Sequence, residues 1–414
     1  MSINNTLKEL LKETSEEIAT KFNKEIELKY YNDNNEIYYL TNIIKELNKM
    51  VYINSKELFN RIKEKIVRNN IIKNIDLLED NTIKITIKEE YLIERLKRIL
   101  KEDKDYGKNN IGNNKKINIE LSIIDEVIDI NKSLNTIITI DNYSRILSYC
   151  GYDIEKEIYI NNNNIDKEEI KILLDKYRIY IDRYSDNKEI EDSYQIEDLL
   201  NKIRYQNICY IDNNSLLLCN KELIDNMGNY TDFAKYLTHI YEKYNNYEKI
   251  VIYNNDRSIE EALKLLNLDL EKIKINNIEG KNIIQENINY TRYKCIINEE
   301  SEKNLIKITT YINKINKCMK SIENNKEVYN NANNNIIYNI INKLTDFEDI
   351  IIKSYQKEDL KIIIDYLLEL ISLINIIIER KSFNNINILN MFNASKIVIN
   401  NSLNIIGLIP IDEI

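Results

Sequence analysis

The residue types that most often carry out chemistry are few and scattered in this chain. It has one histidine, His239, and five cysteines that form no Cys-x-x-Cys pair. A single histidine on a helix is more often structural than catalytic. The wide spacing of the cysteines predicts reduced thiols and argues against a zinc site or a disulfide framework. These cysteines are Cys150, Cys209, Cys219, Cys295 and Cys318.

Other known catalytic patterns are also absent from the sequence. There is no Gly-x-x-x-x-Gly-Lys-[Ser/Thr] phosphate loop, no Gly-x-Ser-x-Gly nucleophile turn and no metal-ligand spacing. The carboxylate pairs Glu168–Glu169 and Glu358–Asp359 stand in highly charged segments, which is typical of solvated helix faces. Residue types alone therefore predict no catalytic residue, no metal site and no cofactor site.

Charge and hydropathy restrict the class of protein. The chain has 414 residues and a net charge of −9, which argues against a protein that coats nucleic acid through a general basic field, although a local basic face remains open. The start is polar, without the apolar region of a signal peptide. The most apolar run, Leu367–Ile378, is interrupted by Glu369 and shorter than the ~20 residues of a membrane span. We expect a cytoplasmic protein with no membrane or DNA partner.

The elements that must position any site fall into three blocks. In residues 1–105, Thr82–Lys88 alternates strictly and predicts a half-buried strand, and Tyr91–Leu100 follows as an amphipathic helix. This block is predicted to be a small α/β domain. The polar segment Lys101–Lys116, which contains Gly107 and Gly112, is predicted to be a linker.

The second block, residues 116–300, repeats a strand followed by a helix. This alternation predicts a parallel sheet with helices packed on it. The predicted strands are Ile117–Leu121, Glu157–Ile160 and Lys249–Tyr253, and the predicted helices are Asn142–Tyr149 and Ile259–Leu266.

The third block, residues 301–414, has a helical period throughout. Asp359–Glu379 and Asn387–Asn400 carry broad apolar faces, which predict a closing helical bundle. Gly407 is placed to end the last helix, and Pro410 to stop it.

Three stretches in this order resemble arginyl-tRNA synthetases, a class I family. The first is Thr82–Ser122 together with Arg145–Ile160 (RILSYCGYDIEKEIYI), the second is Asp225–Asp269, which contains Gly-Asn-Tyr-Thr, and the third is Asp359–Pro410. Glycine placement agrees with the resemblance, because four of the six glycines fall where the family has glycine. These four are Gly107, Gly151, Gly228 and Gly407.

The resemblance implies a fold and a domain order. Residues 1–105 would form the N-terminal domain of the family and residues 116–300 a Rossmann-like catalytic-type domain. Residues 301–414 would form the helical, anticodon-binding (DALR-type) domain. The implied activity of an intact member is the ATP-dependent attachment of arginine to its tRNA.

The positions that would bind ATP have lost the residues of the family. The His-x-Gly-His motif, whose imidazoles donate to phosphate at a helix N-terminus, falls on Ile130, Asn131, Lys132 and Ser133. The second motif, Gly-Ala-Asp-His-His-Gly, falls on Asn254–Ile259. Only its acidic residue persists, as Asp256, and Arg257 and Ser258 replace its histidines. The lysine-bearing loop expected between Ile275 and Tyr290 is interpreted as deleted.

The arginine pocket implied by the resemblance has changed as well. The family places a carboxylate one residue after a basic residue in the helix that follows Asn-Tyr-Thr, and a guanidinium pairs with it. Here Tyr236 follows Lys235, so that carboxylate is missing. Asp232 is interpreted as a capping or surface residue. Tyr230 matches a family tyrosine, although it is also compatible with a core position.

Loss at both pockets predicts a synthetase-like protein without aminoacylation activity that keeps a tRNA-binding or protein-binding role. From Asn331 onward the chain has seven Lys/Arg and ten Asp/Glu, so no strong basic field is evident there. The candidate tRNA contacts in that region are Arg380, Lys381 and Lys396. Two alternatives stay open: a divergent active ligase, which would need ATP, and a structural or regulatory partner of a genuine synthetase.

Overall fold

The computed structural model describes residues 2–33, 36–123, 130–160, 166–191, 194–278, 292–293, 296, 301–324, 334–380 and 386–408. The chain divides into two compact units. One unit contains residues 1–108 and 302–404, and the other contains residues 109–301 and 405–408. The blocks predicted as the first and third domains therefore lie in the same compact unit.

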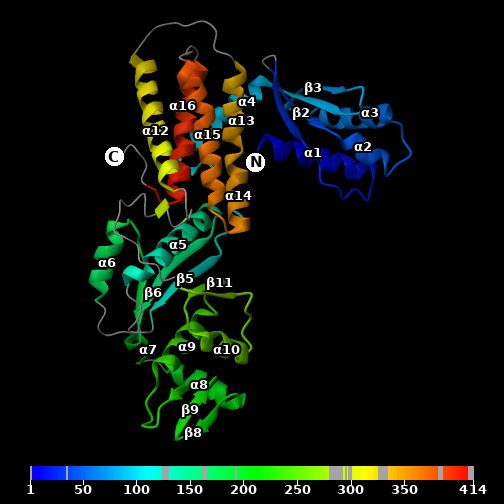
Figure 1. The fold of residues 1–414 in the computed structure, drawn as a ribbon. Coiled ribbons are helices and arrows are strands. Elements are labelled where there is room, and N and C mark those ends of the chain that lie inside the picture. The colour runs from blue at the N-terminus through cyan, green and yellow to red at the C-terminus, as the bar shows by residue number, and fades with distance from the viewer. Residues whose placement is uncertain are drawn as a thin grey trace. The chain divides into compact units, whose positions relative to one another are not determined.

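The N-terminal part of the first unit is a four-stranded antiparallel sheet with helices (Figure 1). Its strand order is β1-β2-β4-β3. The first helix begins where the Ser2 hydroxyl accepts a hydrogen bond from the backbone N–H of Asn5, at 3.1 Å, which caps the helix. The elements are α1 (Ile3–Ile18), β1 (Lys29–Asp33), β2 (Glu36–Thr41), α2 (Ile43–Asn48), α3 (Ser55–Ile66), β3 (Ile72–Leu77), β4 (Ile83–Ile87), α4 (Glu89–Glu102) and a 3₁₀ turn (Asp103–Asp105).

The same unit contains the predicted helical region. Helix α13 packs against β1, β2 and α4, and α15 packs against α13 and α14. Gly407 follows the last helix with a φ of +69°, as expected of a C-terminal glycine, whereas Pro410 lies outside the described residues. The helices are α12 (Ser301–Asn324), α13 (Asn334–Thr345), α14 (Phe347–Lys357), α15 (Lys361–Arg380) and α16 (Ile386–Ile405).

The second unit is built on a five-stranded sheet in the order β12-β11-β5-β6-β7, and every neighbouring pair of strands is parallel. This confirms the predicted Rossmann-like sheet. Helix α5 packs against β5 and β6. The sheet elements and their connecting helices are β5 (Lys116–Ile123), α5 (Ile130–Tyr149), β6 (Asp153–Ile160), α6 (Lys167–Lys176), β7 (Arg183–Asp186), α9 (Asp232–Lys243), β11 (Lys249–Tyr253), α10 (Arg257–Leu265) and β12 (Ile273–Asn276).

A small antiparallel sheet of three strands, which no sequence pattern above predicts, precedes α9. Its hairpin turn is Asn213–Asn214, and both residues have positive φ, as a two-residue turn of type I′ requires. The elements are α7 (Lys188–Glu191), α8 (Gln195–Tyr205), β8 (Tyr210–Asp212), β9 (Ser215–Leu218) and β10 (Lys221–Ile224).

Two general expectations can be compared with the described residues. Cys150, Cys209, Cys219 and Cys318 are free thiols, and Cys295 lies outside the described part of the chain. None of the helices in the described ranges has the length and apolar character needed to cross a membrane.

Candidate functional site

Two carboxylates lie buried on one face of the parallel sheet. Side chains alternate between the faces of a strand, so Asn118, Glu120 and Ser122 of β5 share a face, and all three are buried. Glu157 of β6 stands opposite Glu120 in the register of the two strands. Glu120 is 0% exposed and Glu157 is 1% exposed. Strands of a parallel sheet that are covered on both faces are normally apolar, so this polar face is a departure that needs a chemical reason.

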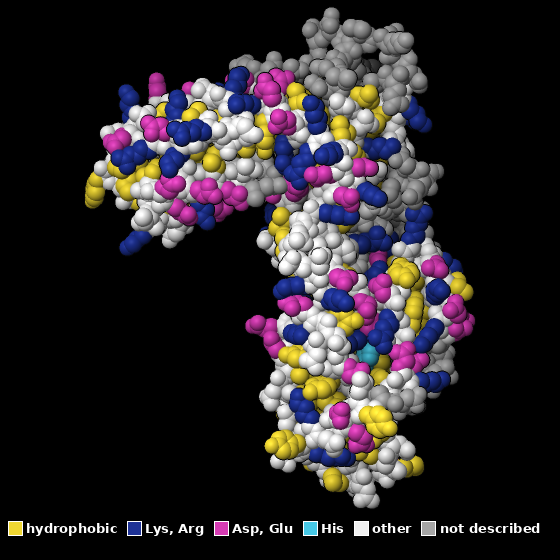
Figure 2. Space-filling view, turned by 180° about the vertical axis from the view of Figure 1, so that it is seen from behind, with side chains coloured by type: hydrophobic (Ala, Val, Ile, Leu, Met, Phe, Trp, Pro, Cys, Tyr) yellow, Lys and Arg dark blue, Asp and Glu magenta, His cyan; other side chains and the backbone are white. Residues whose placement is uncertain are grey.

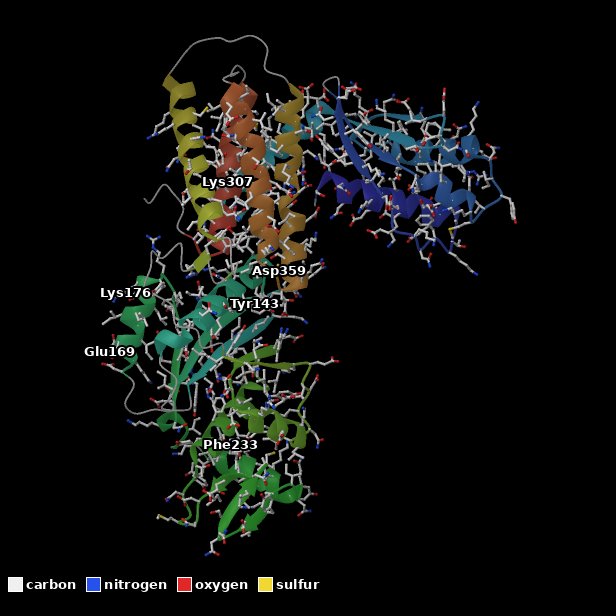
Figure 3. All side chains as sticks on the ribbon, viewed as in Figure 1. Tyr143, Glu169, Lys176, Phe233, Lys307 and Asp359 are labelled. Carbon is white, nitrogen blue, oxygen red and sulfur yellow. The ribbon has the colours of Figure 1, made fainter. Side chains whose placement is uncertain are left out.

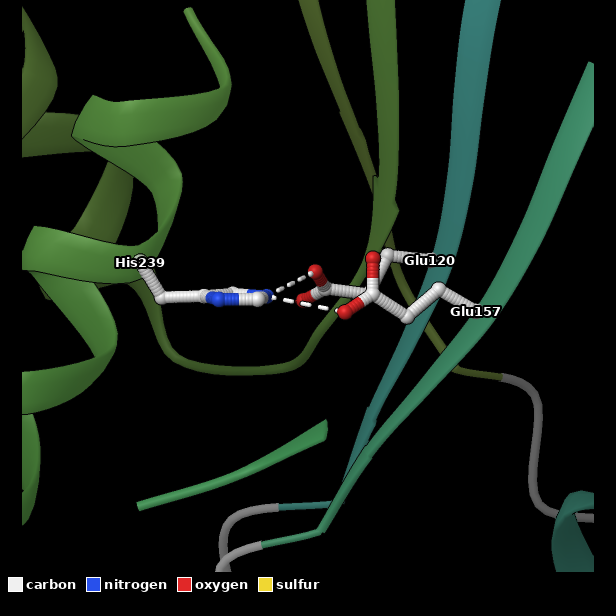
Figure 4. A group of neighbouring side chains, drawn as sticks. All are labelled: Glu120, Glu157 and His239. Atoms are coloured by element: carbon white, nitrogen blue, oxygen red, sulfur yellow. Dashed lines mark hydrogen bonds and ion pairs between the residues drawn. The ribbon is translucent and has the colours of Figure 1, made fainter. Parts of the chain in front are cut away.

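Helix α9 supplies the partners of the two carboxylates. Tyr236, His239 and Lys243 are three and four residues apart, which places them along one face of the helix. Nε2 of His239 lies 3.1 Å from Glu120 and 3.2 Å from Glu157 (Figure 4). The Lys243 ammonium forms ion pairs with both carboxylates, at 2.5 Å for Glu157. The Tyr236 hydroxyl donates to Glu120 at 2.6 Å.

The surrounding strands complete this network. The Ser185 hydroxyl of β7 donates to Glu157, and Lys243 also donates to the Asn118 side chain at 3.2 Å. The Arg183 guanidinium lies 3.8 Å from Glu157 at the more exposed end of the group. Each buried carboxylate thus has several donors, as buried charges require.

The electrostatics of the cluster balance. Burial alone would raise the pKa of Glu120 and Glu157, but Lys243 and His239 outweigh it and hold both pKa values below the usual range. Burial and Lys243 would lower the pKa of His239, yet its bonds to the two carboxylates raise it. Two carboxylates, one ammonium and one imidazolium sum to zero. The Tyr236 hydroxyl stays neutral, because burial and Glu120 raise its pKa well above the usual range.

Glu120, Glu157 and His239 also have the spacing of metal ligands, because their ligand atoms all lie within 4.8 Å of one another. Two carboxylates and an imidazole are a donor set that divalent ions accept. However, the Lys243 ammonium already contacts an oxygen of each carboxylate. The residues present therefore fit a salt-bridge cluster better than a metal site.

A second polar group marks the carboxyl edge of the sheet. Asn254, directly after β11, donates to the Ser122 hydroxyl near the end of β5 at 2.9 Å, and both residues are buried. Strands β5 and β11 are neighbours although they are far apart in sequence, so the strand order reverses between them. Ligands of open parallel sheets bind at such a point.

The structure places the sequence-predicted ATP positions at this edge. Helix α5 begins at Ile130, so the four residues at the place of His-x-Gly-His form its first turn. The side chains of Ile130, Asn131 and Lys132 lie outside the described ones, and Ser133 is buried. The lysine-loop segment from residue 279 to 290 is likewise outside the described residues.

At the second predicted ATP motif, the residues act as parts of a helix start. Asp256 is the N-cap of α10, and its carboxylate accepts from the Ser258 backbone N–H at 2.9 Å. Lys221 forms an ion pair with Asp256 at 3.2 Å. Arg257, in the place of a family histidine, is exposed. Capping thus accounts for the persistence of Asp256 without a nucleotide.

The three predicted arginine-pocket positions do not converge. Tyr236 joins the buried cluster, whereas the Tyr230 hydroxyl donates to Glu197. Asp232 is exposed in the first turn of α9, near Phe233, which is labelled in Figure 3, and it accepts from the Asn187 amide at 2.6 Å. The cap of α9 itself is Thr231.

The predicted tRNA contacts are only partly described. The Arg380 side chain and Lys381 lie outside the described residues. Lys396 of α16 is half-buried. These residues stay a prediction.

Sequence reasoning missed Glu120, Glu157 and Lys243. A signal was present in β5, where Asn118, Glu120 and Ser122 alternate with apolar residues inside a predicted parallel sheet. A strand of that sheet has no solvent face, so its polar positions indicated buried partners.

Comparisons with known proteins agree with the geometry. No family model matches the chain. Over 124 residues, or 30% of the chain, it is 28% identical to the arginine–tRNA ligases of Brucella anthropi and Brucella ovis, and the match spans 21% of each relative. Its fold is similar to the arginyl-tRNA synthetases of Plasmodium falciparum (TM-score 0.61, 12% identity) and Thermus thermophilus (TM-score 0.62, 10% identity), with 99% of each chain covered. The sequence match and the shared fold together identify the chain as a homologue of the arginyl-tRNA synthetases, which are class I enzymes.

Proposed function

We propose that this synthetase homologue does not activate arginine and has kept a tRNA-binding role. The observation that carries the proposal is the neutralised cluster beneath α9, where Lys243 and His239 already bind both buried carboxylates. Loss of the histidine and glycine residues at the ATP motifs supports it independently.

Arginine recognition needs a carboxylate that is free to pair with a guanidinium. Such a planar, bidentate ion pair has no neutral substitute. Tyr236 stands where the resemblance implies that carboxylate, and its neutral hydroxyl is taken up by Glu120. Among the described side chains of this face, Glu120 and Glu157 are each bound by an internal cation. A substrate guanidinium would have to displace Lys243 from both.

Adenylate formation needs donors arranged around the phosphates. Loss of one such donor typically costs roughly 10²–10³ in rate, and the motif positions here retain no histidine. Asp256 is the residue that persists, and it is engaged by Ser258 and Lys221. The chain therefore offers no described replacement for the ATP contacts.

Arginine-dependent ATP–pyrophosphate exchange tests this proposal directly. We expect the purified full chain to show no exchange above background, with and without added tRNA, where a genuine arginyl-tRNA synthetase gives a strong signal under the same conditions. Arginine-dependent exchange by this chain would overturn the proposal in favour of a divergent active ligase.

The RNA-binding role has its own test. A filter-binding titration with tRNA at low salt is expected to show weak, salt-sensitive association. Absence of association at low salt would remove this role. The remaining candidate would then be a structural or regulatory partner of a genuine synthetase, which a pull-down with that synthetase examines.

A further inference from the structure

Helix α12 carries a row of lysines on its exposed side. Lys307, which is labelled in Figure 3, Lys314, Lys317 and Lys320 are all exposed. At 100° per residue these four positions fall within an arc of about 140° and span about 20 Å along the helix axis. Between Asn304 and Lys320 the chain has no Asp or Glu.

The acidic residues of α12 lie at its two ends. Glu302 and Glu323 belong to the first and last turns of the helix. Among the described residues, no carboxylate forms an ion pair with any of the four lysines, and the recorded contact of Lys314 is with the Tyr311 ring, 4.8 Å from its centroid. The positive charge of this row is therefore not neutralised by described neighbours.

The opposite side of α12 is apolar and buried. This excludes a helix that lies on a membrane, because such a helix inserts its apolar face into lipid, whereas here that face already packs inside the unit. Of the other exposed residues, only Ile306 is large and apolar, and the rest are Thr310 and Asn313. The buried residues are Leu305, Ile308, Ile312, Ile315 and Met319.

The rest of the chain gives this row its meaning. The net charge is −9, and on the face shown in Figure 2 basic and acidic side chains are interspersed. RNA binding by such a protein must depend on a local basic face. The stretch from Asn304 to Lys320 is such a face, and it lies outside the region from residue 331 onward in which the sequence placed Arg380, Lys381 and Lys396.

We propose that the exposed face of α12 (yellow in Figure 1) docks the phosphate backbone of folded RNA. This inference rests on the proposed RNA-binding role and names the surface that performs it. Lysines contact phosphate as flexible point charges and carry no base readout. Binding through this face is therefore independent of sequence and strongly dependent on salt.

The experiment replaces the four lysines with glutamine in the full chain. Glutamine has nearly the helix propensity of lysine, so α12 should keep its fold, which circular dichroism would check. Each lost phosphate contact reduces the slope of log K against log salt by roughly 0.7–0.9. We expect the slope to fall by about 2–3 and tRNA affinity near 0.1 M salt to fall at least about tenfold.

A matched control carries the same change of charge elsewhere. Lys12, Lys56, Lys171 and Lys176 are exposed helix lysines, and their replacement by glutamine should leave affinity within about twofold, as expected for residues that do not contact phosphate. Equal loss of affinity in the α12 and control variants would overturn the inference. So would an α12 variant that binds tRNA like the wild type. If the wild type binds no tRNA at all, the proposed RNA-binding role fails as a whole.

The same variants distinguish RNA from other polyanions. Vesicles of phosphatidylserine and a DNA duplex of similar length serve as probes. Binding of the wild type to the vesicles but not to tRNA, lost in the α12 variant, would overturn RNA as the partner. Equal binding to DNA and RNA is expected if backbone phosphates alone are recognised.

Discussion

Glu120 on β5 and Glu157 on β6 occupy the same register position of two neighbouring parallel strands, and both carboxylates are removed from solvent. Neighbouring strands are about 4.8 Å apart, so two like charges at this position repel each other strongly unless cations lie between them. His239 and Lys243 of α9 supply those cations. The docking of α9 on the sheet is therefore coupled to the charge state of this pair.

Replacement of Lys243 by methionine should destabilise the protein strongly. Removal of one partner from a buried ion pair typically costs about 3–5 kcal/mol, because an uncompensated charge remains inside. Lys243 contacts both carboxylates, so we expect a loss at the upper end of that range. The free energy of unfolding from urea titration measures it.

The control is Lys264→Met, which removes an exposed lysine from α10. A surface change of this kind is expected to stay within about 0.5 kcal/mol. A triple variant, K243M with E120Q and E157Q, should recover part of the stability, because no buried charge then lacks a partner. A loss below about 1 kcal/mol in K243M would contradict the buried cluster.

The stability of the protein should fall as pH rises through the pKa of His239. That pKa is raised in the folded state by Glu120 and Glu157, so the imidazolium stabilises the fold below the ordinary value of 6.5 and this contribution is lost above the raised value. The two carboxylates stay ionised over this range, because their pKa values are lowered. H239Q is neutral at every pH, so its free energy of unfolding should change less between pH 6 and 9. Equal pH profiles for both proteins would refute the assignment.

The sequence predicted elements best where the burial pattern is simple. Strand β11 has the predicted bounds, Lys249–Tyr253, because a short apolar run with polar flanks has one interpretation inside a parallel sheet. Helix α5 was predicted only from Asn142, although it begins at Ile130. Its Ile137, Ile138 and Ile140 are all buried, so the helix lacks the polar side that makes a helical period visible.

The candidate site was less accessible to sequence reasoning. The structural interpretation of His239 agrees with its position in the buried cluster, but its partners come from strands more than 80 residues earlier. Only the strand register brings Glu120 beside Glu157, and only the docking of α9 brings Lys243 to both. Spacing along the chain carries no information about either event.

Asp346, which precedes α14, should respond to pH with a different sign from an ordinary ion-paired acid. Burial raises the pKa of its carboxyl to about 7, and Lys343 only partly opposes this. Ionisation of the buried group therefore costs free energy above pH 7, and the cost disappears as pH falls from 7 towards 3.8. D346N should stabilise the protein at pH 8 by about 1–3 kcal/mol and give little gain at pH 4.5.

Urea titrations at both pH values measure this effect, and D365N, at an exposed position of α15, is the control. We expect D365N to change the free energy of unfolding by less than about 0.5 kcal/mol at either pH. Destabilisation by D346N at pH 8 would mean that the ionised carboxylate is stabilised by its surroundings, and the predicted sign would be wrong.

Gly407→Ala should destabilise the protein more than the same change at Gly228. Both glycines have positive φ, +69° and +89°, which costs an alanine about 1–2 kcal/mol. A Cβ on Gly228 would meet nothing within 4 Å, whereas one on Gly407 would lie 2.1 Å from the Arg292 guanidinium. That guanidinium is fully buried, is paired with Asp141 and donates to the Tyr177 carbonyl at 2.9 Å.

Because these bonds hold Arg292 in place, relief of the clash requires breaking a buried ion pair or displacing the chain that follows α16. We therefore expect G407A to lose at least about 3 kcal/mol and G228A no more than about 2 kcal/mol. Thermal unfolding of the two variants beside the wild type measures the difference. Equal losses would show that Arg292 moves aside at no cost, and that its contact with the Gly407 backbone does not hold the end of the chain.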